Sequence, residues 1–351
     1  MSRKVEIGFT ADFIGADGSF LVPGPGPKLT GERLRAGYGI FPEFLREVTP
    51  EQIRGFDIIV SFRPLWKESS LLGNNQLLSI HRLGVGYERL DVPALTKAGV
   101  ILCITPKAIR RPMATSIITL ILALSLRLTT KEKLLREGRW ADASQYKGWS
   151  PEGKTLGSIG VGNIGHEMFR LARQFGMRHI AYDPYANEAN LADADIKLVD
   201  LDTVLAESDI LNISCPLTEE TRHMIGEKEL RKMKKTALLI NTARGPIIDE
   251  PALVKALQEG WLMGAGLDVF EQEPPSPDNP LFKLDNVILT PHALCVTNEL
   301  VMRQWEEVLS QMSQIIKGEM PENMVNPEAW HTEAFQAKLR RFLSETKTAG
   351  S

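Results

Sequence analysis

The sequence has few cysteines and little excess of charge of either sign. Three of its 351 residues are cysteine, Cys103, Cys215 and Cys295, and no two of them form a CxxC pair. An odd number of widely spaced cysteines argues against a disulfide framework and a zinc ribbon, so we expect no metal site. The formal net charge is -3, and a chain of this balance has no basic surface for nucleic acid.

The sequence also lacks a long apolar run, and its first residues do not have the pattern of a signal peptide. Its most apolar stretch, residues 117–126, is well short of the ~20 residues that span a bilayer. The N-terminal MSRKVEIGFT passes from two basic residues directly into a strand-like run, without the apolar core and cleavage site of a signal peptide. We therefore expect a cytoplasmic protein that binds neither membrane nor nucleic acid and whose partners are small molecules.

Strand and helix signals alternate along nearly the whole chain. At 351 residues with 43% apolar content, it is long enough for two domains, each with its own core. One set of apolar runs predicts a parallel sheet covered by helices, at residues 155–159, 180–182, 210–214, 237–240, 265–269 and 287–289. An earlier set predicts a second sheet, at residues 5–9, 58–61, 78–83 and 100–104.

The order of these runs predicts an α/β fold made of two doubly wound, Rossmann-like domains. A discontinuous substrate domain would consist of residues 1–105 and 297–351, and a dinucleotide-binding domain would be inserted at 106–296. Residues 22–27, VPGPGP, are predicted to form a loop because alternating Pro and Gly sustain neither a ladder nor a helix.

A glycine-rich turn, GVGNIG, carries the first functional signal. Gly160, Gly162 and Gly165 follow a strand-like run and precede an amphipathic helical one, which is the context of a dinucleotide-binding motif. The glycines permit a tight turn, close approach of a pyrophosphate, and close packing of helix on strand. The amides of Asn163 and Ile164 would then face phosphate at a helix N-terminus. The alternative is a glycine-rich turn without a ligand.

An acidic residue follows the next predicted strand. Asp183, in HIAYDP, is placed to accept the hydroxyls of an adenosine ribose and to repel a 2'-phosphate. The residues after it supply no cation, so NAD is favoured over NADP. The alternative is a surface helix cap, since Asp before Pro is also a common turn residue.

Three chemically competent side chains follow in strand-end segments. Arg244 lies in NTARGPIIDE, Glu273 in GLDVFEQEP and His292 in LTPHA. The guanidinium suits a substrate carboxylate, the imidazole suits proton transfer to a carbonyl oxygen, and the carboxylate would favour the protonated imidazole. Each has a structural alternative, as a charge partner, a solvated loop acid and a turn histidine. All three at strand ends, where open α/β sheets bind ligands, favour a shared active site.

These motifs resemble the D-isomer-specific 2-hydroxyacid dehydrogenase family, which includes D-3-phosphoglycerate dehydrogenase and glyoxylate/hydroxypyruvate reductase. The resemblance runs from about residue 83 to 326, through LGVGYERLD, GSIGVGNIGHEMFRLARQFGM, AYDPY, CPLTEETRHMIG, LLINTARGPIIDE, GAGLDVFEQEP, VILTPHA and MVNPE. It implies an NAD-dependent oxidoreductase acting on a small 2-hydroxy or 2-oxo acid, with Arg244, Glu273 and His292 as the catalytic set.

The resemblance implies further binding residues and an assembly. The cofactor is expected to contact Cys215, Pro216, Thr221, Thr242 and Asp268. The substrate carboxylate is expected to meet the main chain of Leu83, Gly84, Val85 and Gly86, with the active site between the domains. The apolar stretch 117–126, followed by the segment 140–149, resembles the dimerisation arm of the family, so a homodimer is expected; the alternative is a core helix within one chain.

The chain departs from the family pattern near the predicted substrate pocket. Lys107, Arg110 and Arg111 crowd the segment TPKAIRRPM, which we interpret as an interdomain loop. Arg110 or Arg111 is hypothesised to bind a second anionic group of the substrate, against the alternative of a solvated basic loop. Two other functions stay open: an NADH-sensing protein similar to a corepressor, and a dehydrogenase of the formate or phosphite type.

Overall fold

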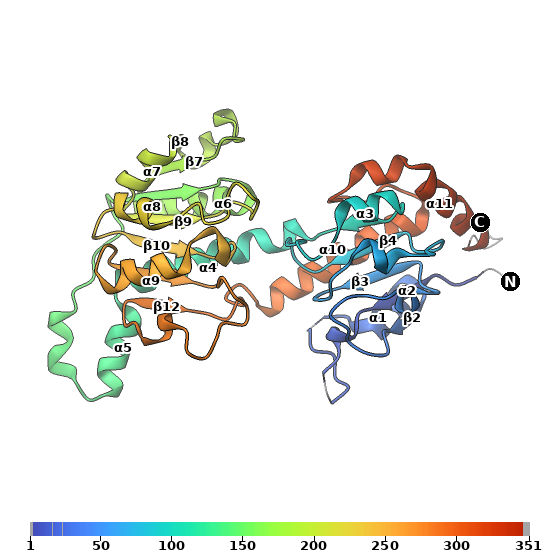
Figure 1. Cartoon of the computed structure of the whole chain (residues 1–351), viewed down its shortest axis with the longest axis horizontal. Helices are drawn as coiled ribbons and strands as arrows, with labels where there is room; N and C mark the ends of the chain where they lie inside the picture. The colour runs from blue at the N-terminus through green and yellow to red at the C-terminus, as the bar shows by residue number, and fades with distance from the viewer. Residues whose placement is uncertain (1–2, 16, 23, 347–351) are drawn as a thin grey trace. The chain divides into compact units, whose positions relative to one another are not determined.

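The computed structural model describes residues 3–15, 17–22 and 24–346, and the chain divides into two compact units (Figure 1). Unit 1 consists of residues 1–109 and 297–351, and unit 2 of Arg110–Val296. The predicted border after residue 105 falls just before the observed one after residue 109. Helix α4 (Pro106–Ser125) carries the chain across this border.

Unit 1 is built on a five-stranded sheet in which all strands are parallel. The order is β2-β1-β3-β4-β5. The strands are β1 (Glu6–Phe9), β2 (Gly37–Ile40), β3 (Ile58–Ser61), β4 (Ser79–Arg82) and β5 (Ile101–Cys103). Strands β3, β4 and β5 are buried almost throughout, as expected for a sheet covered on both faces.

Helices cover both faces of this sheet, and each face has its own apolar core. One core includes Phe9, Ile58 and Ile101 from the strands and side chains of α1 (Gly26–Leu34), α10 (Asn298–Lys317) and α11 (Glu333–Thr346). The opposite core contains Ile59 and Leu102, which alternate with Ile58 and Ile101 along their strands. It is covered by α2 (Pro50–Ile53), α3 (Val92–Lys97) and the short helix η2 (Glu68–Leu71).

The predicted loop at residues 22–27 is wrong at its C-terminal end. Helix α1 begins at Gly26, and Pro27 lies in its first turn. Proline is tolerated there because the first turn of a helix has no internal acceptor for the N–H that proline lacks. Pro23 lies outside the described residues.

The C-terminal helix α11 belongs to the core of unit 1. Phe335, Leu339 and Phe342 recur at helical spacing, and all three are buried. The ring of Phe335 lies 5.0 Å from that of Trp330. The C-terminal tail therefore packs on unit 1, the unit to which it belongs.

Unit 2 contains a seven-stranded parallel sheet in the order β12-β11-β10-β9-β6-β7-β8. The strands are β6 (Thr155–Ile159), β7 (Arg178–Tyr182), β8 (Ile196–Leu198), β9 (Ile210–Ile213), β10 (Leu238–Asn241), β11 (Gly264–Leu267) and β12 (Val287–Leu289). The order reverses direction at β6, as it does in the doubly wound fold that binds dinucleotides. The predicted α/β class with two doubly wound, Rossmann-like sheets is confirmed.

One face of this sheet is covered by α7 (Leu201–Glu207), α8 (Glu227–Lys232) and α9 (Glu250–Gln258). Helix α6 (Asn163–Ala172) lies on the other face, where the ring of Phe169 is 4.9 Å from that of His179 on β7. On the same strand Ile180 points into the first core, because side chains alternate along a strand. Helix α5 (Leu128–Arg136) follows α4.

Short 3-10 helices complete the described structure. They are η1 (Ala11–Phe13), η3 (Trp140–Gln145), η4 (Arg173–Phe175), η5 (Glu188–Asn190), η6 (Ala192–Ala194), η7 (Gly245–Ile247), η8 (Pro280–Lys283) and η9 (Pro327–His331).

Helix α4 corrects the interpretation of TPKAIRRPM as a loop. Residues 106–113 of this segment form the first turns of the helix, which continues through Pro112. The helix is also long and apolar enough to cross a membrane by length and composition, and 56% of its most apolar stretch is buried. Leu120 and Leu124 lie within contact distance of a Cβ placed on Gly266 of β11, so this helix packs on the sheet of unit 2.

Replacing Phe335 by alanine tests the packing of α11. We expect Phe335→Ala to lower the free energy of unfolding by about 3–5 kcal/mol, because a fully buried aromatic side chain leaves a cavity. Phe44→Ala, at a residue of the same unit that is 51% exposed, should change it by less than about 0.5 kcal/mol. Urea denaturation of both variants measures the difference. Equal effects would mean that α11 does not stabilise unit 1.

Candidate active site

Most of the predicted catalytic and cofactor residues gather at one edge of the sheet in unit 2. Because its strands are parallel, the segments that follow β6, β9, β10, β11 and β12 all leave from their carboxyl ends. In open α/β sheets this edge binds the ligand, next to the point where the strand order reverses. The glycine-rich turn follows β6 at that point.

The glycine-rich turn has the geometry of a phosphate-binding loop. Gly160 has a φ of 86°, and a Cβ there would lie 2.6 Å from the backbone nitrogen of Cys215. Gly162 has an ordinary φ of -64°, and a Cβ there would meet nothing within 4 Å. The first position therefore needs glycine to pack the turn against the end of β9. The second needs it only if a ligand lies against the backbone.

Helix α6 directs its N-terminus to the same space. It begins at Asn163 after Gly162, without a side chain that caps it. The first N–H groups of a helix have no internal acceptor, and with the helix dipole they favour an anion. The open face of Gly162 and these amides fit the pyrophosphate of a dinucleotide.

Asp183 lies beside the glycine-rich turn, one residue beyond β7. Its Oδ2 accepts a hydrogen bond from the backbone N–H of Val161 at 2.9 Å, and its Oδ1 accepts one from Tyr185 at 3.0 Å. The carboxylate thus belongs both to a turn and to the border of the phosphate loop. A negative charge in this place suits a ribose and opposes a 2'-phosphate.

The segments after β9 and β10 border the same edge. Thr221 donates from Oγ1 to the carbonyl of Pro216 at 2.7 Å and so closes the loop that begins at Cys215. Burial raises the pKa of the Cys215 thiol to about 11, which keeps it neutral. Thr242, directly after β10, is 7% exposed.

Arg244 is held by a close backbone approach. A Cβ on Gly245 would collide with the carbonyl carbon and oxygen of Phe270, so only glycine allows the chain to pass the end of β11 at this point. The side-chain amide of Asn241 donates to the carbonyl of Arg244 at 2.9 Å. The charge of Arg244 is felt at Glu273, whose pKa it lowers.

Glu273 and His292 form a hydrogen-bonded pair. The Nδ1 atom of His292 lies 2.8 Å from Oε2 of Glu273. Burial raises the pKa of Glu273, but the hydrogen bond and charge of His292, the N–H of Phe270 and the charge of Arg244 outweigh it. The pKa of this carboxyl therefore lies below its ordinary value. Because Glu273 occupies Nδ1, the Nε2 atom of His292 is the one that can serve a substrate.

The loop that carries His292 is anchored by Asp268. This carboxylate is fully buried and accepts hydrogen bonds from Thr290 Oγ1 at 2.6 Å and from the N–H groups of Ala293 and Leu294 at 3.1 and 3.2 Å. His292 itself has a φ of 53°, a left-handed conformation that is uncommon outside glycine. Sequence reasoning assigned Asp268 to the cofactor and missed this structural role, because it depends on contacts beyond the strand.

The predicted carboxylate-binding segment lies in unit 1, after β4. Leu83 is buried, and Gly84 has a φ of 112°. The N–H of Gly84 donates to Oγ1 of Thr105 at 2.8 Å, and the N–H of Thr105 donates to the carbonyl of Gly84 at 2.9 Å. The guanidinium of Arg82 donates to the carbonyl of Gly86. Sequence reasoning missed Thr105 and Arg82, which hold this loop.

The two arginines hypothesised to bind a second anionic group have a partner inside unit 2. Arg111 pairs with Glu167 of α6 at 2.7 Å, and Arg110 lies 3.9 Å from the same carboxylate. The side chain of Glu167 is 8% exposed, so this pair links α4 to α6. Their role toward a substrate stays a prediction.

No cluster of three or more potential metal ligands occurs among His, Cys, Asp and Glu within residues 3–15, 17–22 and 24–346.

The fold and the site define a nicotinamide-dependent oxidoreductase. The family model described as "D-isomer specific 2-hydroxyacid dehydrogenase, NAD binding domain" matches residues 118–293. The chain belongs to the D-isomer specific 2-hydroxyacid dehydrogenase family. It is an NAD-dependent enzyme that acts on the hydroxyl group of a 2-hydroxy acid.

Curated relatives of known name agree with this family. Glyoxylate reductase of Korarchaeum cryptofilum is 43% identical over 256 residues, which are 72% of this chain and 77% of that protein. D-3-phosphoglycerate dehydrogenase of Methanocaldococcus jannaschii is 41% identical over 252 residues, which are 72% of this chain but 48% of that protein.

Solved structures share the fold of this chain. A glyoxylate reductase from Paecilomyes thermophila has a TM-score of 0.79 and 30% identity, with 92% of this chain and 98% of that chain covered. D-lactate dehydrogenase from Aquifex aeolicus, complexed with NAD and lactic acid, has a TM-score of 0.79 and 28% identity, with 91% and 98% covered.

Replacing Gly162 tests the phosphate loop without disturbing the fold. Because its φ suits any residue and its Cβ would have free space, Gly162→Ala should keep the free energy of unfolding within about 0.5 kcal/mol. A methyl group there should hold a pyrophosphate away and raise the Kd for NADH by about tenfold or more, which is about 1.4 kcal/mol. Fluorescence titration with NADH measures this change.

Gly226→Ala is the matched control, since Gly226 precedes α8 with a φ of -103° and a Cβ there would also be accommodated. Equal Kd values for both variants would place the pyrophosphate elsewhere.

Proposed function

We propose that this enzyme reduces glyoxylate and related small 2-oxo acids with NADH. The observation that carries the proposal is the 2.8 Å hydrogen bond between Glu273 and His292, which leaves one imidazole nitrogen for a substrate oxygen. The relatives named glyoxylate reductase support the choice of substrate class. When bound, the nicotinamide supplies the hydride.

The side chains of unit 2 divide the remaining work. Arg244 binds the substrate carboxylate through its planar guanidinium and polarises the carbonyl. His292 donates a proton from Nε2 to the carbonyl oxygen as that oxygen gains charge. Glu273, ionised at neutral pH, orients the imidazole and stabilises its protonated form.

The cofactor would be held by the turn after β6 and by its neighbours. Gly160, Gly162 and Gly165 with the amides of Asn163 and Ile164 receive the pyrophosphate. Asp183 receives the adenosine ribose, and Cys215, Pro216, Thr221, Thr242 and Asp268 border the rest. The open space at Gly162 is the feature of this chain that supports the assignment.

The substrate carboxylate would also be met by the main chain of Leu83, Gly84, Val85 and Gly86. The hydrogen bonds of Gly84 to Thr105 give this segment one conformation and so support the assignment. Arg110 is the better candidate for a second anionic group, because Arg111 is closer to Glu167 and more fully paired.

A panel of 2-oxo acids tests the proposal. NADH oxidation should be fastest with glyoxylate or hydroxypyruvate, and His292→Gln should lower kcat by about 10²- to 10⁴-fold because a proton donor is lost. The Kd for NADH should stay unchanged, which separates a chemical defect from a folding defect.

A preference for phosphohydroxypyruvate would favour a dehydrogenase of phosphorylated acids and a role for Arg110. Full turnover in His292→Gln would remove this residue from the mechanism. Tight NADH binding without turnover on any acid would contradict the proposed substrate class and favour a sensor.

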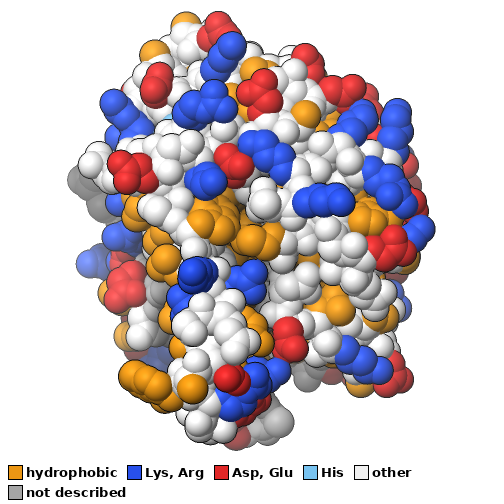
Figure 2. Space-filling view, turned by 90° about the vertical axis from the view of Figure 1, so that its left-hand side faces the viewer, with side chains coloured by type: hydrophobic (Ala, Val, Ile, Leu, Met, Phe, Trp, Pro, Cys, Tyr) orange, Lys and Arg blue, Asp and Glu red, His pale blue; other side chains and the backbone are white. Residues whose placement is uncertain are grey.

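We further propose a homodimer that forms through α5 and η3. Leu128 and Leu135 are each 60% exposed and Trp140 is 79% exposed, and exposed apolar side chains that gather in one region mark an interaction site. Figure 2 views the molecule from the side on which α5 lies in Figure 1, and shows hydrophobic side chains gathered between charged ones.

The three free cysteines are compatible with a cytoplasmic enzyme, where thiols stay reduced.

Sedimentation equilibrium tests the dimer. The double variant Leu128→Ser/Leu135→Ser should shift the mass from dimer to monomer, because it removes apolar area that a partner would cover. Leu72→Ser, at a residue of unit 1 that is 65% exposed, is the control and should stay dimeric. A monomeric wild-type chain, or a dimer that survives the double variant, would contradict this interface.

A further inference from the structure

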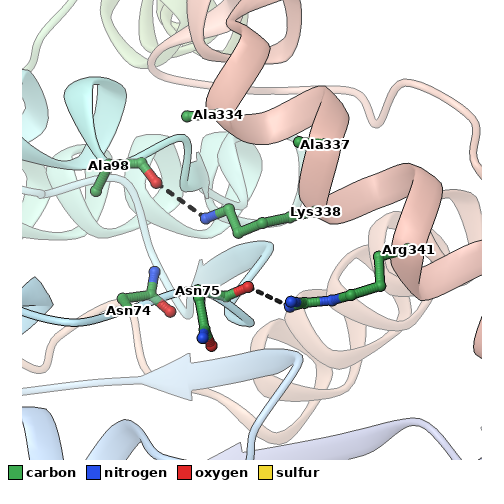
Figure 3. A pocket seen from close by; sticks show the side chains of 7 residues that line it. All are labelled: Asn74, Asn75, Ala98, Ala334, Ala337, Lys338 and Arg341. Carbon is green, nitrogen blue, oxygen red and sulfur yellow. Dashed lines mark hydrogen bonds between the residues drawn. The ribbon is translucent and has the colours of Figure 1, made fainter.

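Unit 1 contains a pocket that the proposed reaction does not use. It has a volume of about 290 Å³ and is lined by Lys338 and Arg341 of α11, Asn74 and Asn75, and Ala98 (Figure 3). Asn74 and Asn75 precede β4, and Ala98 precedes β5. The pocket thus lies at the amino-terminal edge of the sheet, opposite the edge that carries the predicted carboxylate-binding loop after β4.

Lys338 is an unusual residue for this position because its side chain is buried. It is 8% exposed, and its ammonium donates to the carbonyls of Leu77 at 2.7 Å and Ala98 at 2.9 Å. An ammonium has three N–H donors, so one remains for the pocket. Burial, and to a smaller extent the charge of Arg341, lower the pKa of Lys338 to about 7. An anion beside it would favour the charged form.

Asn74 adds a second donor. Its Oδ1 accepts from the N–H groups of Gln76 at 3.2 Å and Leu77 at 3.0 Å, which determines the orientation of the amide. Its Nδ2 is buried and has no hydrogen-bond partner in the structure. In Figure 3 this nitrogen points to the side on which the ammonium of Lys338 lies. A buried donor without an acceptor is uncommon and calls for a partner.

Arg341 supplies the third group. Its guanidinium donates to the carbonyl of Asn75 and lies 3.9 Å from Glu345, at the rim of the pocket (Figure 3). The lining residues include two cations and no acidic side chain. The carbonyls of Leu77, Ala98 and Asn75 already accept from these cations, which leaves donors in excess. A ligand that matches them must be rich in acceptors and negatively charged.

We propose that this pocket binds a small oxyanion, a carboxylate, sulfate or phosphate group, between Lys338, Arg341 and Asn74. The anion accepts from all three and joins α11 to the loops before β4 and β5. Binding therefore stabilises unit 1 by mass action, and the effect saturates at the occupancy of one site.

Calorimetric titration with sodium sulfate tests the site, with NADH at saturation so that the phosphate loop of unit 2 is occupied. Sodium chloride at equal ionic strength corrects for screening. The wild-type chain should bind one sulfate per unit 1, and Arg341→Gln should weaken it by about tenfold or more. Arg340→Gln is the matched control, because Arg340 is the adjacent residue of α11, pairs with Glu333 at 2.6 Å and does not line the pocket. It should leave sulfate affinity within about twofold of wild type.

Asn74→Asp gives an independent test. It keeps the Oδ1 acceptor that holds the loop, but replaces the unpartnered donor by a negatively charged oxygen. Sulfate binding should be lost while the chain stays folded and reduces its 2-oxo acid at the wild-type rate. Titration with phosphate and with acetate, which has no 2-hydroxy or 2-oxo group, then distinguishes an inorganic anion from a carboxylate.

Absence of saturable binding in the wild-type chain for all three anions would overturn the proposal. Equal loss of affinity in Arg340→Gln and Arg341→Gln would do the same, since it would reduce the effect to general charge. A catalytically inactive chain that still binds sulfate would leave this site standing and contradict only the proposed function.

Discussion

The buried carboxylate of Asp268 joins the ends of two neighbouring strands. It follows β11 and accepts three hydrogen bonds from the segment after β12, which carries His292. A charge in a fully buried place is tolerated only when donors surround it, and here these donors belong to one loop. The geometry of His292, the proposed proton donor, therefore depends on a residue that need not touch the substrate to matter.

The same edge of the sheet is organised by close backbone packing. Gly245 passes so near Phe270 that no larger residue fits, and Gly160 packs against the end of β9 in the same way. Arg244 and the phosphate loop are thereby placed by main chain rather than by flexible side chains. Parallel strands make this possible because all of their carboxyl ends reach one edge.

Much of the fold could be predicted because parallel strands that are buried on both faces form continuous apolar runs. Every predicted strand is present, with small differences at the ends. The strands β2 and β8 were not predicted. β2 reads GYGI, with glycine at alternate positions, and β8 is three residues long with the exposed Lys197 at its centre. Both lie at sheet edges, where burial is incomplete and the apolar signal is weak.

Helix α4 shows where local rules failed. The segment TPKAIRRPM was interpreted as a loop, yet the helix continues through Pro112, because Leu120 and Leu124 pack on β11. Packing energy outweighs the hydrogen bond that proline removes. The basic cluster of this segment is likewise explained by a distant partner, since Arg111 pairs with Glu167, far along the chain.

The sequence by itself determined the class of the protein, because the glycine-rich turn and the three strand-end segments are local motifs with a fixed chemical meaning. Only the tertiary structure decided how these residues are held. The pairing of His292 with Glu273, the anchoring of its loop by Asp268 and the burial of Lys338 against Leu77 and Ala98 join residues from different parts of the chain. Such contacts depend on how strands and helices pack, and local sequence patterns do not encode which distant residues meet.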